Sequence, residues 1–93
     1  MTTDLGEADD RVRGAMARDV LDFLAQSIVD DPDSVEVTVE EGRRGDVRLS
    51  LNVSPDDMGK VIGRRGRVAQ AIRTVVRAAG AREGIDVGVD IVD

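Results

Sequence analysis

The pattern of hydrophobic and polar positions divides the chain into helical and extended segments. Between Arg11 and about Val29, apolar side chains recur at every fourth position, as they do along one face of an α-helix. Asp10 is suited to cap this helix at its start, and Asp30-Asp31-Pro32 ends it because a residue before proline disfavours the helical conformation. The apolar residues of the predicted face are Val12, Met16, Val20, Leu24 and Ile28, supported by Ala17, Leu21 and Phe23.

Three segments alternate between apolar and polar residues, as half-buried β-strands do. The first covers residues 35–39 and the second covers residues 47–53. The glycine-containing segment 41–45 between them predicts a tight turn, so these two strands form a hairpin. The third alternating segment covers residues 85–91 and closes the domain.

Two further helices are predicted between the second and third strands. Ser54-Pro55-Asp56-Asp57 combines a capping serine, a proline at the first helical position and acids in the first turn, so a short helix runs from Pro55 to about Ile62. A longer helix follows, and Gly80 is predicted to end it. Its apolar face comprises Val68, Ile72, Val75, Val76 and Ala79, and its polar face comprises Arg67, Gln70, Arg73, Thr74 and Arg77.

The predicted order of elements is therefore α-β-β-α-α-β. Strands whose apolar residues all point to one side need a cover, so we expect an α+β fold in which three helices cover one face of a three-stranded sheet as a two-layer sandwich. A helical crossover joins the last two strands, which favours parallel pairing and a mixed sheet. Residues 1–9 are predicted to be a mobile acidic tail, and residues 10–93 a single domain.

The composition argues against most catalytic chemistry. The 93 residues include no cysteine and no histidine, so the chain lacks thiol nucleophiles, the usual general base and the usual transition-metal ligands. Asp30, Asp31 and Asp33 do not form a calcium loop, because glycine is absent from the sixth position. We therefore expect a binding module with no catalytic residue, metal or cofactor. The start of the chain has no secretory signal and no apolar run is long enough to span a membrane, so we expect a cytoplasmic protein.

Basic residues are concentrated in one segment, although the formal net charge of the chain is -6. Residues 58–82 contain no acid, whereas the rest of the chain contains all 19 acidic residues. A solvated helix face normally mixes both signs, so this separation predicts a locally positive surface on a negative body. The basic residues of the segment are Lys60, Arg64, Arg65, Arg67, Arg73, Arg77 and Arg82.

The centre of this segment is Gly63-Arg64-Arg65-Gly66, in the turn between two consecutive helices. The two glycines can be explained simply as the end of one helix and the start of the next. Alternatively, they let backbone N–H groups approach a phosphodiester backbone at a helix N-terminus, where the two arginines add phosphate contacts. The spacing from Gly59 onward matches neither GxGxxG nor GxxxxGK[ST], the nucleotide-binding motifs.

The run from Gly59 to Arg67 resembles the signature of the KH domain, whose GxxG loop holds about four nucleotides of single-stranded nucleic acid. The element order is similar to the type II, bacterial KH arrangement. The sequence that continues to Val76 resembles the small stand-alone bacterial KH proteins of the KhpA family. The resemblance covers about residues 11–93. It implies that Gly63, Arg64, Arg65 and Gly66 clamp the phosphate backbone, and that Gly59, Lys60, Ile62, Arg67 and Gln70 flank the groove.

The resemblance also carries expectations about function. It implies non-catalytic binding of single-stranded RNA, as an RNA chaperone or post-transcriptional regulator, by a homodimer or a heterodimer with a larger KH-containing protein. Many KH domains have a bulky aliphatic residue at the position of Ala69, so we expect this alanine to widen or flatten the groove. The alternative is a protein-interaction module with weak or no RNA binding, in which the apolar surplus of the first helix and of residues 68–79 continues into a dimer interface instead of being simply core.

Overall fold

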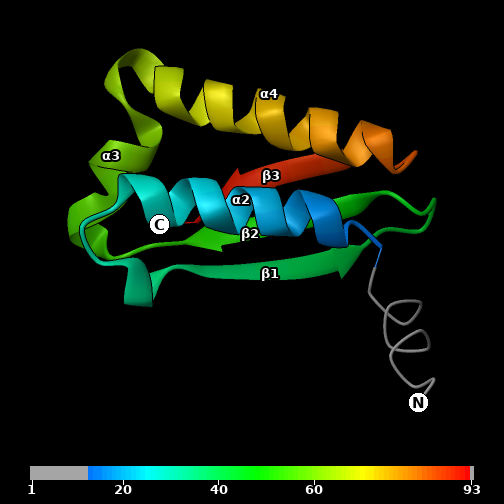
Figure 1. Cartoon of the computed structure of the whole chain (residues 1–93), viewed down its shortest axis with the longest axis horizontal. Coiled ribbons are helices and arrows are strands. Elements are labelled where there is room, and N and C mark those ends of the chain that lie inside the picture. Colours follow the sequence, from blue (N-terminus) through cyan, green and yellow to red (C-terminus); the bar gives the residue numbers. More distant parts are fainter. Residues whose placement is uncertain (1–12, 93) are drawn as a thin grey trace.

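Three strands form one mixed sheet, and the helices lie on one of its faces (Figure 1). The computed structural model describes residues 13–92. The strands are β1 (Glu36–Glu41), β2 (Val47–Asn52) and β3 (Val87–Ile91), in the order β1-β2-β3. β1 pairs antiparallel with β2, and β2 pairs parallel with β3. The predicted hairpin and the predicted parallel pairing of the last two strands are both confirmed.

The described residues form three α-helices: α2 (Ala15–Ile28), α3 (Met58–Ile62) and α4 (Arg67–Arg82). α2 and α4 run side by side over the sheet, while the short α3 lies at one end of the molecule (Figure 1). Short 3₁₀ turns at Pro32–Ser34 (η1), Pro55–Asp57 (η2) and Arg64–Gly66 (η3) join these elements. The predicted α+β fold and its order α-β-β-α-α-β are confirmed. None of the helices in residues 13–92 has the length and apolar character needed to cross a membrane.

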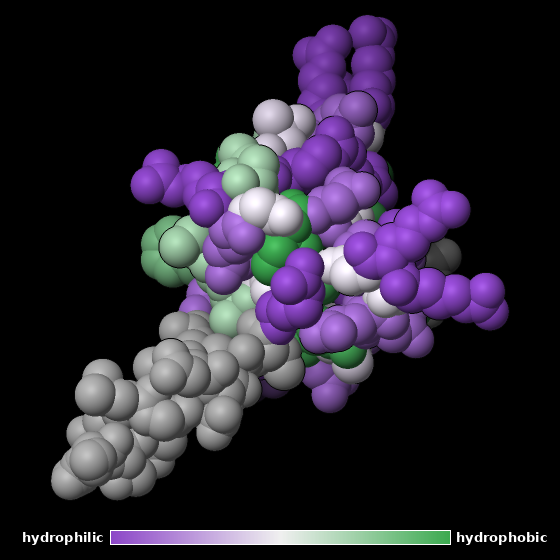
Figure 2. Space-filling model, turned by 90° about the vertical axis from the view of Figure 1, so that its right-hand side faces the viewer, coloured by the Kyte–Doolittle hydropathy of each residue, from purple (hydrophilic) through white to green (hydrophobic). Residues whose placement is uncertain are grey.

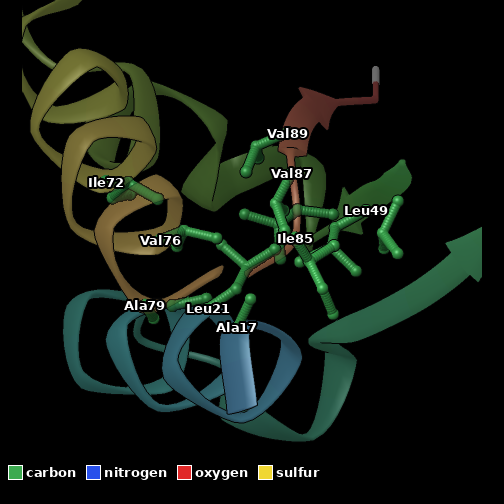
Figure 3. Packing of buried hydrophobic residues seen from close by; sticks show 12 residues of the cluster. Ala17, Leu21, Leu49, Ile72, Val76, Ala79, Ile85, Val87 and Val89 are labelled. Carbon is green, nitrogen blue, oxygen red and sulfur yellow. The ribbon is translucent and has the colours of Figure 1, made fainter. Parts of the chain in front are cut away.

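The core lies between the sheet and the two long helices (Figure 3). Alternate residues of each strand point to the same side of the sheet, so every second residue of β2 is buried against α2 and α4, as are Val87 and Val89 of β3, while Ile91 is half-buried. The buried cluster comprises Ala17, Leu21 and Ala25 of α2, Val47, Leu49 and Leu51 of β2, Ile72, Val76 and Ala79 of α4, and Ile85, Val87 and Val89 in and before β3.

The buried face of α2 agrees only in part with the predicted one, since Val20, Leu24 and Ile28 of that face are partly buried against the core. Ala17, Leu21 and Ala25 are fully buried, whereas the side chains of Met16 and Phe23 are 44% and 70% exposed. The two apolar faces are adjacent on the helix and have the same four-residue spacing, so periodicity cannot separate them. The face with the alanines is the one that packs against the neighbouring elements, because small side chains let α2 approach α4 closely.

The start of α2 is also displaced from its predicted position. The predicted cap Asp10, the first predicted helical residues and the acidic tail lie outside the described residues. Within the described residues, Arg13 and Gly14 form a turn, and the helix begins at Ala15. Gly14 immediately before it has a φ of 81°, a left-handed conformation that glycine adopts without strain.

The end of α4 corrects a second prediction, because Gly80 lies inside the helix. The N–H of Gly84 donates to the carbonyl of Ala81 at 2.9 Å, and the N–H of Ile85 donates to the carbonyl of Gly80 at 2.9 Å. This is a Schellman motif with Gly84 at its left-handed position. Gly80 has a different role: a Cβ at this position would overlap the side chain of Val87, so the glycine lets α4 approach β3.

Candidate nucleic-acid interface

The GxxG loop (Gly63-Arg64-Arg65-Gly66) connects α3 to α4. The N–H of Gly63 donates to the carbonyl of Gly59 at 2.9 Å and so closes the last turn of α3. Gly63 has φ 77° and ψ 170°, a region of backbone conformation that only glycine occupies readily. A Cβ at Gly63 would also overlap Val68, so this position requires glycine both for its conformation and for space.

The second half of the loop contains two consecutive left-handed residues. Arg65 has a φ of 60° and is the only residue other than glycine with a positive φ in residues 13–92. Gly66 follows with φ 74°, and no atom lies within 4 Å of the place where its Cβ would be. The N–H of Gly66 donates to the carbonyl of Gly63 at 3.1 Å, which holds the turn closed. Gly66 therefore adopts the left-handed backbone conformation that the turn requires, and it leaves open space above the loop.

This loop stands at the N-terminus of α4, the longest helix that the structure describes. The first N–H groups of a helix have no partner within it and attract anions. Arg64 and Arg65 are exposed at the tip of the loop, and Arg67 is exposed at the start of α4. The arrangement combines backbone donors, a helix N-terminus and three guanidinium groups, which suits a phosphate group.

The remaining residues of the predicted site lie on the two helices that flank the loop. Gly59 and Ile62 are exposed on α3, and Gln70 is exposed on the first turn of α4. A Cβ at Gly59 would meet no atom within 4 Å, so this glycine leaves open space on the surface of α3. Ala69 is buried with 3% of its surface exposed, and its predicted widening or flattening of the groove stays a prediction.

Among contacts between described residues, Lys60 is the one predicted site residue that has acidic partners. Its Nζ lies 3.1 Å from a carboxylate oxygen of Asp30 and 4.0 Å from one of Asp57. The hydrogen bond with Asp30 and the negative charge of its carboxylate raise the pKa of Lys60 above its ordinary value. The sequence gives no sign of this contact, because η1, β1, β2 and η2 lie between Asp30 and the helix of Lys60.

Asp57 forms a buried connection that sequence analysis missed. Its side chain is almost fully buried, although the sequence places it among solvated acids of a helix start. The backbone N–H groups of Asp30 and Asp31 donate to its two carboxylate oxygens at 3.2 and 3.1 Å. The carboxylate thereby holds the end of the α2 segment against the start of α3. Ser54, predicted as the capping residue, makes no side-chain capping bond and instead accepts the N–H of Asp57 through its carbonyl at 2.8 Å.

Arg73 is a further basic residue near the sheet, which the predicted site did not include. Its Nε donates to the carbonyl of Val89 at 3.3 Å. Within the described residues β3 pairs only with β2, so this carbonyl belongs to the edge strand. The contact connects the polar face of α4 to the edge of β3.

The tetrapeptide Gly-Arg-Arg-Gly also occurs at residues 42–45, where it has a different structure. There it closes the β1–β2 hairpin, and the N–H of Gly42 donates to the carbonyl of Asp46 at 2.8 Å. A strand follows it instead of a helix, and acids precede and follow it at Glu41 and Asp46. This end of the molecule faces the viewer in Figure 2, where hydrophilic side chains project around small hydrophobic patches. The hairpin turn therefore has the same residues as the GxxG loop without its helix N-terminus or its basic surroundings.

The comparison with known protein families agrees with this geometry. The family model described as "KhpA/KhpB, KH domain" matches residues 18–91. The chain belongs to this family. The type II KH arrangement predicted from the element order is thereby confirmed, with α3, the GxxG loop and α4 between β2 and β3.

Several curated relatives of this KH chain have the name RNA-binding protein KhpA. The relative from Streptomyces coelicolor is 53% identical over 78 residues, which are 84% of this chain and 94% of the relative. The relative from Clostridium acetobutylicum is 47% identical over 75 residues, covering 81% of this chain and 99% of the relative. The relative from Mycobacterium tuberculosis is 46% identical over 79 residues, covering 85% and 94%.

Among solved structures, the chain is similar to Era in complex with MgGDPNP and nucleotides 1506–1542 of 16S ribosomal RNA. The TM-score is 0.61 and the sequence identity is 16%. The likeness covers 88% of this chain and 31% of the longer Era chain. At this identity the likeness shows a shared fold.

Proposed function

We propose that this chain binds single-stranded RNA through the GxxG loop and catalyses no reaction on it. The observation that carries the proposal is a glycine-dependent loop with exposed arginines at the N-terminus of α4. The membership of a family whose curated relatives are named RNA-binding proteins supports it. The lack of histidine and cysteine in the sequence fits a binding role better than a catalytic one.

In this proposal the RNA backbone lies across the loop. A phosphate approaches the open space above Gly66, where no Cβ blocks access to the N-terminus of α4. Arg64 and Arg65 add charge-assisted hydrogen bonds to neighbouring phosphates. The same RNA strand is bordered, on α3 and on the first turn of α4, by Gly59, Lys60, Ile62, Arg67 and Gln70.

This mode of binding predicts modest affinity and low sequence selectivity. Contacts to phosphates position a nucleic acid without reading its bases. The only aromatic residue, Phe23, lies on α2, away from the loop, so base stacking on an aromatic side chain contributes nothing there. Such binding suits an RNA chaperone or post-transcriptional regulator acting on many transcripts in the cytoplasm.

We also propose that the chain forms a homodimer or pairs with a larger KH-containing protein. The exposed apolar side chains of Met16 and Phe23 border an open hollow on α2, and Val75 on the neighbouring α4 is 47% exposed. Met16 lies in the first turn of α2, and Phe23 and Val75 lie near the middle of α2 and α4, so none of the three belongs to the GxxG loop. Pairing through this face therefore leaves the loop free for RNA.

The test of RNA binding compares two double variants of the full chain. Arg64→Asp/Arg65→Asp reverses the charge of the GxxG loop, and Arg43→Asp/Arg44→Asp makes the same change in the hairpin turn. Both variants have the same net charge and keep all glycines. Aspartate also tolerates the left-handed conformation of position 65 better than most residues. Each protein is titrated into a fluorescent pool of short single-stranded RNA, and circular dichroism verifies its fold.

We expect the loop variant to lose at least about tenfold in affinity, since each charge-assisted hydrogen bond contributes about 1.5–3 kcal/mol. The hairpin variant should bind much more like the wild type. The wild-type affinity should fall with salt at a slope of about -0.7 per phosphate in a plot of log K against log salt concentration. Equal losses in both variants would contradict the proposal, because net charge alone would then explain binding.

A further inference from the structure

Lys60 belongs to the proposed RNA-binding surface, yet its ammonium group is already engaged. Its Nζ lies 3.1 Å from a carboxylate oxygen of Asp30, whose side chain is 81% exposed. A phosphate and a carboxylate both accept hydrogen bonds from an ammonium group and both carry negative charge. RNA that contacts Lys60 must therefore share or replace the position of the Asp30 carboxylate.

Asp30 is held in this position by a buried group. The backbone N–H of Asp30 donates to Asp57, and the next N–H, of Asp31, donates to the second oxygen of the same carboxylate. Asp57 is buried and begins the α3 segment that carries Lys60 three residues later. The same carboxylate thus fixes the backbone of Asp30 relative to the helix of Lys60, which places the Asp30 side chain within reach of the ammonium group.

The other acids of this turn lie in different environments. Asp31 accepts a hydrogen bond from the hydroxyl of Ser34 at 2.7 Å. Asp33 is exposed in η1, and no described residue forms an ion pair with it. Asp30 is therefore the exposed acid of the turn that is aimed at the basic surface.

We propose that Asp30 competes with RNA phosphate for Lys60 and thereby limits the affinity of the GxxG surface for RNA. This inference rests on the proposed RNA-binding function. An exposed ion pair is weak enough for RNA to displace it, so the expected effect is moderate. RNA that contacts the protein through several phosphates displaces Asp30 from Lys60, whereas RNA held through one or two phosphates gains too little binding free energy to do so. Asp30 therefore disfavours the binding of short or weakly held RNA.

The test is a double-mutant cycle in the full chain. Asp30→Asn removes the competing charge with little change in shape, and Asp33→Asn removes an equal charge from the same turn without touching Lys60. Lys60→Gln is combined with each of the two. The probe is a short fluorescein-labelled oligouridylate, and fluorescence anisotropy gives the affinity between about 50 and 200 mM salt.

We expect Asp30→Asn to raise the affinity about twofold to fivefold at the lower salt concentration, with a smaller effect of Asp33→Asn. In the Lys60→Gln background, the two substitutions should have equal and small effects. The slope of log K against log salt concentration should become steeper by about 0.7 in Asp30→Asn, because Lys60 then neutralises one more RNA phosphate and no carboxylate has to be displaced from it. A merely structural role of Asp30 would leave this slope unchanged.

Two results would overturn the inference. Equal gains from Asp30→Asn and Asp33→Asn would mean that only the general charge of the turn matters. A gain from Asp30→Asn that persists in the Lys60→Gln background would mean that Asp30 acts through another group. The Arg64→Asp/Arg65→Asp variant is included in the same titration. If this variant binds RNA normally, the proposed function itself has failed. If it loses binding, only the inference about Asp30 has failed.

Discussion

Asp57 is predicted to be the most sensitive acidic residue of the described fold. Replacing it with alanine removes the acceptor for two backbone N–H groups, those of Asp30 and Asp31. A hydrogen bond to a charged group contributes about 1.5–3 kcal/mol, but these two bonds are only partly buried, so we expect Asp57→Ala to cost about 2–4 kcal/mol of unfolding free energy. Asp57→Asn retains one acceptor oxygen and places an amide donor against the other N–H, so it should cost about 1–3 kcal/mol.

Urea unfolding followed by circular dichroism measures these losses, with Asp56→Asn as the matched control. Asp56 is exposed in the same turn, so its substitution should change the unfolding free energy by less than about 0.5 kcal/mol. Thermal melts should show the same order, with a decrease of about 4–8 °C for each kcal/mol in a domain of this size. If Asp57→Asn were no more destabilising than Asp56→Asn, the carboxylate would not be holding the two segments together.

Three further predictions concern the glycines and the lysine of the α3–α4 region. Gly63→Ala should destabilise the fold by about 1–3 kcal/mol in thermal unfolding, because alanine is strained at this φ and ψ and its Cβ overlaps Val68. Gly80→Ala should be destabilising by about 1–2 kcal/mol in urea unfolding, since overlap with Val87 outweighs the gain of about 1 kcal/mol in helix propensity. The contact with the Asp30 carboxylate stabilises the fold and raises the pKa of Lys60, so the stability difference between wild type and Lys60→Gln should be constant from neutral pH up to the ordinary value of 10.5 and disappear as the pH rises through the higher folded pKa.

Each of these predictions has a control in the chain. Gly66→Ala meets open space and costs only its left-handed conformation, about 1–2 kcal/mol, so it should be milder than Gly63→Ala. Ala81→Gly, on the exposed side of the same helix, should lose about 1 kcal/mol, the ordinary propensity effect that Gly80→Ala fails to recover. If the stability difference between wild type and Lys60→Gln persisted at pH values above the folded pKa of Lys60, the charge of Lys60 would not be the source of its stabilisation.

The sequence predicts the sheet well because the signals that define it are local. Strict alternation places the three strands, and the crossover from β2 to β3 favours their parallel pairing. The GxxG loop was also predictable, since glycines between two helical patterns leave few other conformations. Here the residue types themselves determine the backbone.

The parts that sequence reasoning missed depend on contacts between distant segments. The hydrophobic pattern of α2 contains two neighbouring faces, and the pattern alone places Met16 and Phe23 in the core, although the packing centres the buried face on Ala17, Leu21 and Ala25. Gly80 and Gly84 are both plausible ends of α4, and only the approach of β3 distinguishes them. The burial of Asp57 arises from backbone groups at the end of α2, and nothing within a few residues of Asp57 indicates it.

The hairpin turn at residues 42–45 offers a practical handle on this protein. It lies at the opposite end of the molecule from the GxxG loop (Figure 1), and Arg43 at its tip is exposed. Because the sequence contains no cysteine, Arg43→Cys would introduce the sole thiol of the chain. A dye or surface linker attached there would report on unlabelled RNA from the end of the molecule opposite the loop, and so would leave the loop itself free.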